Sequence, residues 1–303
     1  MEGSQAVNDT LHITSGDIAG KLLAKSGIQG DVLVWHDILY DGPREPGWPD
    51  DKILNARAQF IERTTGGGLD RAFVLNTLKH QYERLAQAKN GEKIVLWFDG
   101  CLFDQSMLAH ILTCMDFGDI GAAELLCVDA FPGIDPFNGL GQLNPEQLAL
   151  LFGQRRSLTR KQFEFAAIVD RAFATQEPKL FGDLAAMTRA PLPWVPAAVA
   201  RWLQEQPDPC TGLGRLETLA LEAVRSGCKT PPEIFKAVAA ADTPPQYWGD
   251  ITLWAKINAL ADRKNPLIKI EGLLPRLPQW EGLADLTQFR IEALPDAADS
   301  TEA

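Results

Sequence analysis

Four short apolar runs in the first half of the chain are each followed closely by an aspartate. The runs are LHIT at 11–14, VLVWH at 32–36, IVLWF at 94–98 and ELLCV at 124–128, and the acids are Asp17, Asp37, Asp99 and Asp129. If these runs are parallel strands, their carboxyl ends share one edge of a sheet, which is where open α/β proteins bind ligands. Several carboxylates held together there suit a hard cation such as Mg²⁺, which holds and polarises phosphate groups.

This pattern predicts binding of a nucleotide or another phosphorylated small molecule, with phosphoryl transfer or phosphoester hydrolysis as the expected chemistry. Mg²⁺ is the expected cofactor. We expect three metal ligands, which are Asp17, Asp37 and Asp99. The expected catalytic residues are Asp17, Asp37 and His12, with His12 as a proton carrier. The expected substrate contacts are Ser15, Gly16, Trp35, Gly42, Asp104 and Gln105.

A purely structural interpretation of the same residues stays open. Aspartate is a frequent cap and turn former where strands end and helices begin, so Asp17 and Asp104 can simply cap the helices that follow. A histidine inside a strand, such as His12, is often hydrogen-bonded within the core. Trp35 and Trp97 can stack a base, or they can fill the space between the sheet and its helices.

Other candidate motifs are weaker. Cys101 lies near a helix start, which lowers a thiol pKa, but the adjacent Asp99 opposes this effect and no third member of a triad is evident. The five cysteines are scattered without a CxxC pair, and we expect reduced thiols. The glycine-rich stretches TTGGGLD and NGLGQLN match neither a phosphate loop nor a dinucleotide fingerprint, and we interpret both as linkers.

The elements that position these residues follow from hydrophobic periodicity. Helical patterns separate the strands, at 17–25, 50–64, 70–88 and 105–115, and predict a layered α/β domain with a parallel sheet over residues 10–140. Residues 141–207 read as an all-helical segment without a strand signal. In residues 208–293 we expect helices at 215–226, 231–239 and 248–262, followed by strands at 267–272 and 286–292. Three helices followed by a hairpin is the order of a winged-helix domain.

Composition limits the classes of partner. The formal net charge of −11 repels phosphate backbones and anionic membranes, and the second and third helices of the winged-helix-like part carry one lysine each, Lys236 and Lys256. DNA binding is therefore disfavoured. No apolar run approaches the roughly 18 residues of a membrane span, and the polar start lacks the order of a secretory signal. We expect a cytoplasmic protein with flexible tails at 1–9 and 294–303.

Three stretches, LHITSGD, VLVWHDILYDGP and VLWFDGCLFDQSMLAHIL, resemble the bacterial family catalogued as domain of unknown function 1835. The resemblance covers about residues 10–130 and continues through EPKLFGDL, GLGRLETLALEAV and YWGDITLWAKINAL. The family supplies no established activity. The resemblance implies that the following positions belong to the sequence pattern of the family: His12, Gly16, Asp17, Trp35, Asp37, Gly42, Pro43, Asp104 and Gln105.

Two other functional hypotheses stay open beside the ligand site. In the first, the protein is a non-enzymatic regulator whose α/β domain is a sensor and whose winged-helix-like end contacts DNA or a partner protein. In the second, it is a structural or interaction module without a ligand. The sequence predicts no oligomeric state.

Overall fold

The computed structural model describes residues 10–88, 91–115, 123–279 and 285–295. The predicted tail at 1–9 and most of the predicted tail at 294–303 lie outside these residues. The chain divides into two compact units. Unit 1 comprises Met1–Phe60 and Ala72–Arg201, and unit 2 comprises Ile61–Arg71 and Trp202–Ala303.

All four predicted strands are present in unit 1. They are β1 (Thr10–Ser15), β2 (Asp31–Trp35), β3 (Lys93–Asp99) and β4 (Ala123–Val128), all parallel to one another. The sheet order is β2-β1-β3-β4-β5, in which β5 (Arg156–Ser157) pairs antiparallel with β4. β5 lies within the segment predicted to be all-helical. It has two residues, both exposed, so it leaves no periodic pattern to detect.

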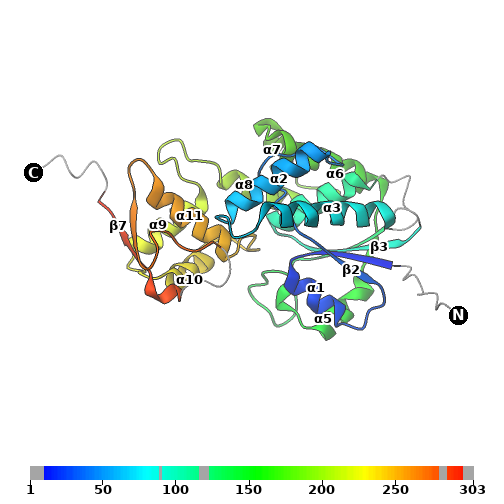
Figure 1. Ribbon diagram of the computed structural model, residues 1–303. Coiled ribbons are helices and arrows are strands. Elements are labelled where there is room, and N and C mark those ends of the chain that lie inside the picture. Colours follow the sequence, from blue (N-terminus) through cyan, green and yellow to red (C-terminus); the bar gives the residue numbers. More distant parts are fainter. Residues whose placement is uncertain (1–9, 89–90, 116–122, 280–284, 296–303) are drawn as a thin grey trace, which may run out of the picture. The chain divides into compact units, whose positions relative to one another are not determined.

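Helices cover both faces of this sheet, as the predicted α/β class requires (Figure 1). On one face, α1 (Asp17–Ala24) and α5 (Pro145–Leu151) bury Ala19, Leu23 and Leu148 against Val95 and Trp97 of β3. The opposite face carries α3 (Arg71–Ala88) and α6 (Arg160–Thr175). α4 (Leu102–Cys114) packs against α6 and β3. Since helices cover both faces of the sheet, side chains on both sides of each strand are buried, and the strand sequences are nearly continuous apolar runs.

The register places the strand ends level with one another. Ser15 lies opposite Trp35, and Asp99 lies opposite Val128. β1 and β3 are neighbours, but the chain leaves β1 toward β2 on one side and leaves β3 toward β4 on the other. Their carboxyl ends therefore form the topological switch point at which open α/β sheets bind ligands.

Three other helices and two 3₁₀ turns belong to the described residues that precede Arg215. α2 (Asp51–Thr64) follows the β2 loop, and α7 (Pro178–Ala185) and α8 (Val195–Gln204) follow α6. Two 3₁₀ turns, η1 (Leu140–Gln142) and η2 (Phe152–Gln154), flank α5. The described part of the 141–207 segment is thus mostly helical, as predicted.

Unit 2 contains three helices followed by an antiparallel strand pair. These are α9 (Arg215–Arg225), α10 (Pro231–Ala241), α11 (Asp250–Asp262), β6 (Ile268–Glu271) and β7 (Arg290–Ala293), with η3 (Leu286–Gln288) before β7. α9 packs against α10, α11 and β7. The order of elements agrees with the sequence, whereas the winged-helix assignment itself stays a prediction.

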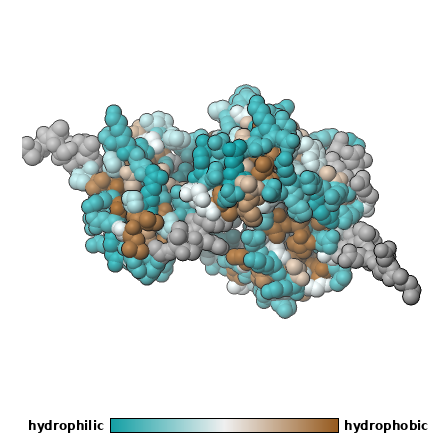
Figure 2. Space-filling view, in the orientation of Figure 1, coloured by the Kyte–Doolittle hydropathy of each residue, from teal (hydrophilic) through white to brown (hydrophobic). Residues whose placement is uncertain are grey.

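The visible surface is mostly hydrophilic, with hydrophobic residues exposed in separate patches (Figure 2). Within the described ranges, no helix combines the length and the apolar character that a membrane span requires. All five cysteines are free thiols, as expected from their spacing.

Candidate functional site

Three side chains join the ends of β1 and β3. The hydroxyl of Ser15 donates to Oδ1 of Asp104 at 2.5 Å, and the backbone N–H of Asp99 donates to Oδ2 of Asp104 at 2.7 Å. Gln105 Nε2 donates to the carbonyl oxygen of Asp99 at 2.6 Å. Three of the predicted substrate contacts, Ser15, Asp104 and Gln105, are therefore brought together with Asp99.

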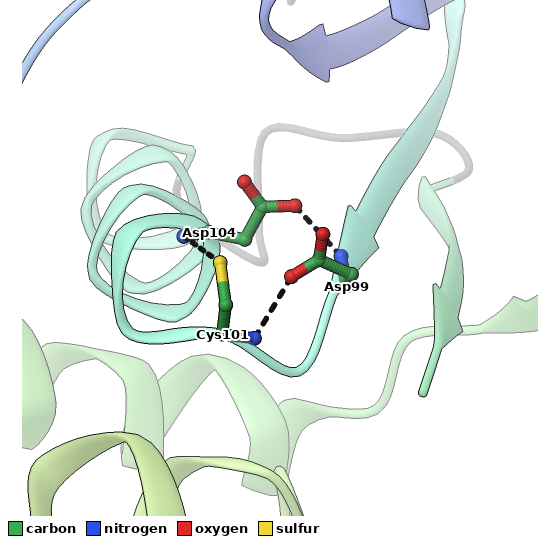
Figure 3. A group of neighbouring side chains, drawn as sticks. All are labelled: Asp99, Cys101 and Asp104. Atoms are coloured by element: carbon green, nitrogen blue, oxygen red, sulfur yellow. Dashed lines mark hydrogen bonds between the residues drawn. The ribbon is translucent and has the colours of Figure 1, made fainter. Parts of the chain in front are cut away.

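Asp104 faces Asp99 across the first turn of α4 (Figure 3). One oxygen of each carboxyl group and Sγ of Cys101 all lie within 4.8 Å of one another. Asp99 Oδ1 accepts the backbone N–H of Cys101 at 2.8 Å, and Cys101 Sγ accepts the backbone N–H of Asp104. Cys101 is thus the N-cap of α4, which begins at Leu102, three residues before the predicted start. Asp104 is not the cap, contrary to the sequence-based interpretation.

This carboxyl pair is buried and therefore favours its protonated forms. Burial raises the pKa of Asp99 to about 6, and burial together with the charge of Asp99 raises the pKa of Asp104 well above its usual range. Two carboxylates at this separation also repel each other, so the pair holds a proton more strongly than an isolated carboxyl group does. Burial also raises the pKa of the Cys101 thiol, which makes Cys101 a poor nucleophile.

The N-terminus of α1 lies beside this pair. Gly16 is the N-cap, with φ of 73°, and no side chain caps the helix. Asp17 is the first residue within the helix, so the predicted capping role for Asp17 is wrong. Its exposed carboxylate contacts Nε2 of His36 at 3.1 Å. The uncapped backbone N–H groups and the helix dipole make this end suitable for a phosphate group.

The NGLGQLN stretch lies against this site, so its interpretation as a simple linker is wrong. A Cβ atom at Gly139 would overlap Oδ2 of Asp99, and one at Gly141 would contact Ile18 of α1. The φ of Gly139 is 120°, a value that residues with a Cβ rarely adopt. Glycine at 139 therefore allows the backbone to approach the Asp99 carboxyl group.

The predicted set of metal ligands does not form as expected. Among the described residues, the one group of three carboxylate, thiol or imidazole ligands close enough to share an ion is Asp99, Cys101 and Asp104. A thiol is a soft ligand, whereas Mg²⁺ prefers an octahedron of oxygen atoms. Both oxygens of Asp104 already accept protein N–H or O–H groups. This buried group does not fit Mg²⁺.

Asp37 belongs to a buried ion pair instead. Oδ1 accepts from Nη2 of Arg57 at 2.5 Å, and both oxygens lie 2.9 Å from Nε of the same guanidinium. Oδ1 also accepts the backbone N–H of Ile38. Neither side chain of the pair exposes more than 1% of its surface. Asp37 therefore stabilises the turn after β2, and the structure does not place it with Asp17 and Asp99.

His12 lies in the core and not at the sheet edge. Its Nδ1 accepts from the indole N–H of Trp97, and its Nε2 donates to the carbonyl of Gln29, both at 3.1 Å. Burial lowers the pKa of His12, which favours the neutral ring. His12 lies three positions before Ser15, the last residue of β1, which is about 10 Å along a strand. The predicted role of His12 as a proton carrier at the edge is therefore not supported.

Trp35 and Gly42 also have structural surroundings. Trp35 is fully buried and makes edge contacts with Tyr82 and His110, so it presents no surface on which a base could stack. Gly42 has a φ of 81°, and a Cβ there would collide with the ring of Phe60. Both residues hold the β2 loop against the helices.

A second buried polar cluster was not predicted. The guanidinium of Arg44 pairs with Asp170, His110 Nδ1 lies 3.1 Å from Asp170 Oδ1, and the Tyr82 hydroxyl lies 2.6 Å from His110 Nε2. Asp170 occupies the apolar stripe of α6 with Phe163, Ala166 and Phe173. A charged residue within such a stripe was the available signal.

A comparison of the chain with known protein families finds no match, and a search of curated proteins finds no relative. The resemblance to domain of unknown function 1835 therefore stays a prediction from the three motifs.

Proposed function

We propose that unit 1 binds a nucleotide or another phosphorylated small molecule at the switch point between β1 and β3. The observation that carries this proposal is the uncapped N-terminus of α1, which begins at that point behind the open glycine Gly16. No atom lies within 4 Å of a Cβ placed at Gly16, so a ligand can approach the backbone closely. The phosphate group would accept hydrogen bonds from the first N–H groups of α1.

Asp17 defines the metal part of this proposal. Asp17 is the first residue of the helix, and its exposed carboxylate would repel a phosphate group bound there. A divalent cation removes this repulsion, and Mg²⁺ commonly binds one or two carboxylates together with substrate phosphates. We therefore assign Mg²⁺ to Asp17 and to the ligand, and not to Asp37 or the buried Asp99.

The proposal extends to phosphoryl transfer or phosphoester hydrolysis. A reaction of this kind needs a group that donates a proton to the leaving oxygen. Asp99, whose pKa is about 6, fits this role at the strand edge, where His12 does not lie. The phosphate release rate should fall at least tenfold in Asp99→Asn while Mg²⁺-dependent binding persists. An unchanged release rate would remove Asp99 from the reaction.

A thermal-shift screen tests the binding site. Nucleotides and sugar phosphates, each with and without Mg²⁺, should raise the melting temperature of the wild type in a Mg²⁺-dependent way. Asp17→Asn should lose the dependence on Mg²⁺, whereas Asp183→Asn, another exposed helical acid, should retain it. An identical Mg²⁺-dependent shift in wild type and Asp17→Asn would contradict the assignment.

The order of elements in unit 2 supports a regulatory protein as a second candidate function. Three helices and an antiparallel strand pair follow one another as in winged-helix domains. α10 carries only Lys236 and α11 only Lys256 as basic residues, so a protein partner is favoured over DNA. A fluorescence anisotropy titration with duplex DNA at low salt should show no tighter binding than an acidic control protein.

A further inference from the structure

Trp194 lies over the same edge of the sheet, directly before α8. Its indole N–H donates to Oδ2 of Asp129, the residue after β4, at 3.1 Å. A Cβ atom at Gly100, the residue after β3, would lie 3.0 Å from Cδ1 of Trp194. The indole is therefore packed on the turn after β3 and tied to the turn after β4.

The indole is also rigidly presented. Pro191, Pro193 and Pro196 surround it in sequence, and each proline fixes its own φ angle. The carbonyl of Trp194 accepts the backbone N–H of Ala198 at 3.1 Å, which anchors it to the first turn of α8. A side chain fixed in this way loses little conformational entropy when a ligand stacks on it.

Trp194 is partly exposed, unlike Trp35 and Trp97, which expose none of their surface. Trp194 thus offers an accessible aromatic surface next to Asp99 and Gly100. Trp35 and Trp97, the two tryptophans that the sequence suggested for stacking, offer none. Aromatic side chains stack on nucleobases through offset contacts between their π systems, with little dependence on the identity of the base.

The sheet geometry sets the length of a ligand that reaches both features. β1 and β4 are separated by β3, so their ends are two strand spacings apart, about 10 Å. A phosphate at the start of α1 and a ring on Trp194 must therefore belong to an elongated molecule. A nucleotide has this form, whereas inorganic phosphate and a short sugar phosphate do not.

We propose that Trp194 stacks on the base of the bound ligand, so that the edge site selects nucleotides over sugar phosphates. This inference rests on the proposed function of unit 1. Trp194 is the specificity-determining residue, and Asp129 is a positioning residue that holds the indole in place. The role of Asp129 is thus different from the metal ligation assigned to Asp17.

Isothermal titration calorimetry of the full chain with Mg²⁺ tests the proposal, with ADP and ribose 5-phosphate as probes. Wild type should bind ADP more tightly than ribose 5-phosphate. Trp194→Ala should weaken ADP binding roughly tenfold or more and leave ribose 5-phosphate binding unchanged. Trp194→Phe retains a ring and should keep most of the ADP affinity. Asp129→Ala, which removes the acceptor of the indole N–H, should weaken binding of ADP alone.

Control outcomes separate this inference from the function on which it rests. Equal affinities of wild type for the two probes, or equal losses for both probes in Trp194→Ala, would overturn the role of Trp194 and leave a phosphate site at α1. If wild type binds neither probe, the proposed function fails and this inference fails with it. Trp194→Leu, which fills space without an aromatic ring, supplies the decisive comparison with Trp194→Phe if Trp194→Ala does not fold.

Discussion

The hydroxyl of Ser15 donates to Oδ1 of Asp104 at 2.5 Å, which joins the end of β1 to the first turn of α4 across 89 residues of sequence. The other oxygen of Asp104 accepts the backbone N–H of Asp99 at the end of β3. A single buried carboxyl group therefore holds together the two strand ends that form the switch point. The position of the proposed ligand site depends on this contact.

Asp104→Ala should lower the free energy of unfolding by about 1–3 kcal/mol, because it leaves a buried N–H without an acceptor. Burial raises the pKa of Asp104, which favours the neutral carboxyl group, and asparagine resembles that form closely. Asp104→Asn should therefore cost clearly less than Asp104→Ala in urea denaturation. Equal losses in the two variants would contradict a neutral Asp104.

Asp99 should make stability depend on pH in an identifiable direction. Its pKa is about 6 in the folded protein, compared with about 3.9 in an unfolded chain. The folded state thus binds the proton more tightly, and the stabilisation is fully present below about pH 4 and lost as pH rises through about 6. Wild type should lose stability across this window relative to Asp99→Asn, measured by urea denaturation. Parallel profiles for the two proteins would disprove the assignment.

Two glycines of one loop provide a matched test of the close approach to Asp99. Both have positive φ, 120° at Gly139 and 84° at Gly133, but a Cβ at Gly133 would meet no atom within 4 Å. Gly139→Ala should therefore lower the free energy of unfolding by about 1–3 kcal/mol more than Gly133→Ala. It should also weaken ligand binding at the edge. Equal effects in thermal unfolding would show that Gly139 does not shape the site.

The Asp37–Arg57 pair should contribute to stability and not to binding. Removing one partner of a buried ion pair costs about 3–5 kcal/mol, so Asp37→Ala should be strongly destabilising. Asp51→Ala, which removes an exposed pair with Lys79, should cost no more than about 1 kcal/mol. Chemical denaturation gives both values. If Asp37→Ala retains stability but loses Mg²⁺-dependent binding, the metal-ligand prediction was correct after all.

The strands of unit 1 could be predicted because their burial on both faces leaves continuous apolar runs in the sequence. The surroundings of the predicted site residues could not be predicted, because their partners lie far along the chain. His12 contacts Trp97, and Asp37 contacts Arg57, and no local pattern reports such contacts.

Helix starts show the same limit on a smaller scale. Aspartate is a good cap by propensity, so the sequence favours Asp17 and Asp104 as the caps. The structure begins α1 behind Gly16 and α4 behind Cys101, each before the acid, because the turn geometry selects the cap. Residue propensities therefore predict that both helices exist, but they do not predict which residues cap the helices beside the site.

Hydrogen–deuterium exchange of the full chain, with and without saturating ADP and Mg²⁺, tests the central claim most directly. Backbone N–H groups of Asp17, Ile18 and Ala19 should exchange more slowly in the presence of ligand, because they donate to its phosphate. The start of α5 is the control, since the Asn144 side chain already accepts the N–H of Gln147 at 2.9 Å, and its exchange should not change. Unchanged exchange at Asp17–Ala19 under conditions in which ADP is bound would place the ligand elsewhere and contradict the account.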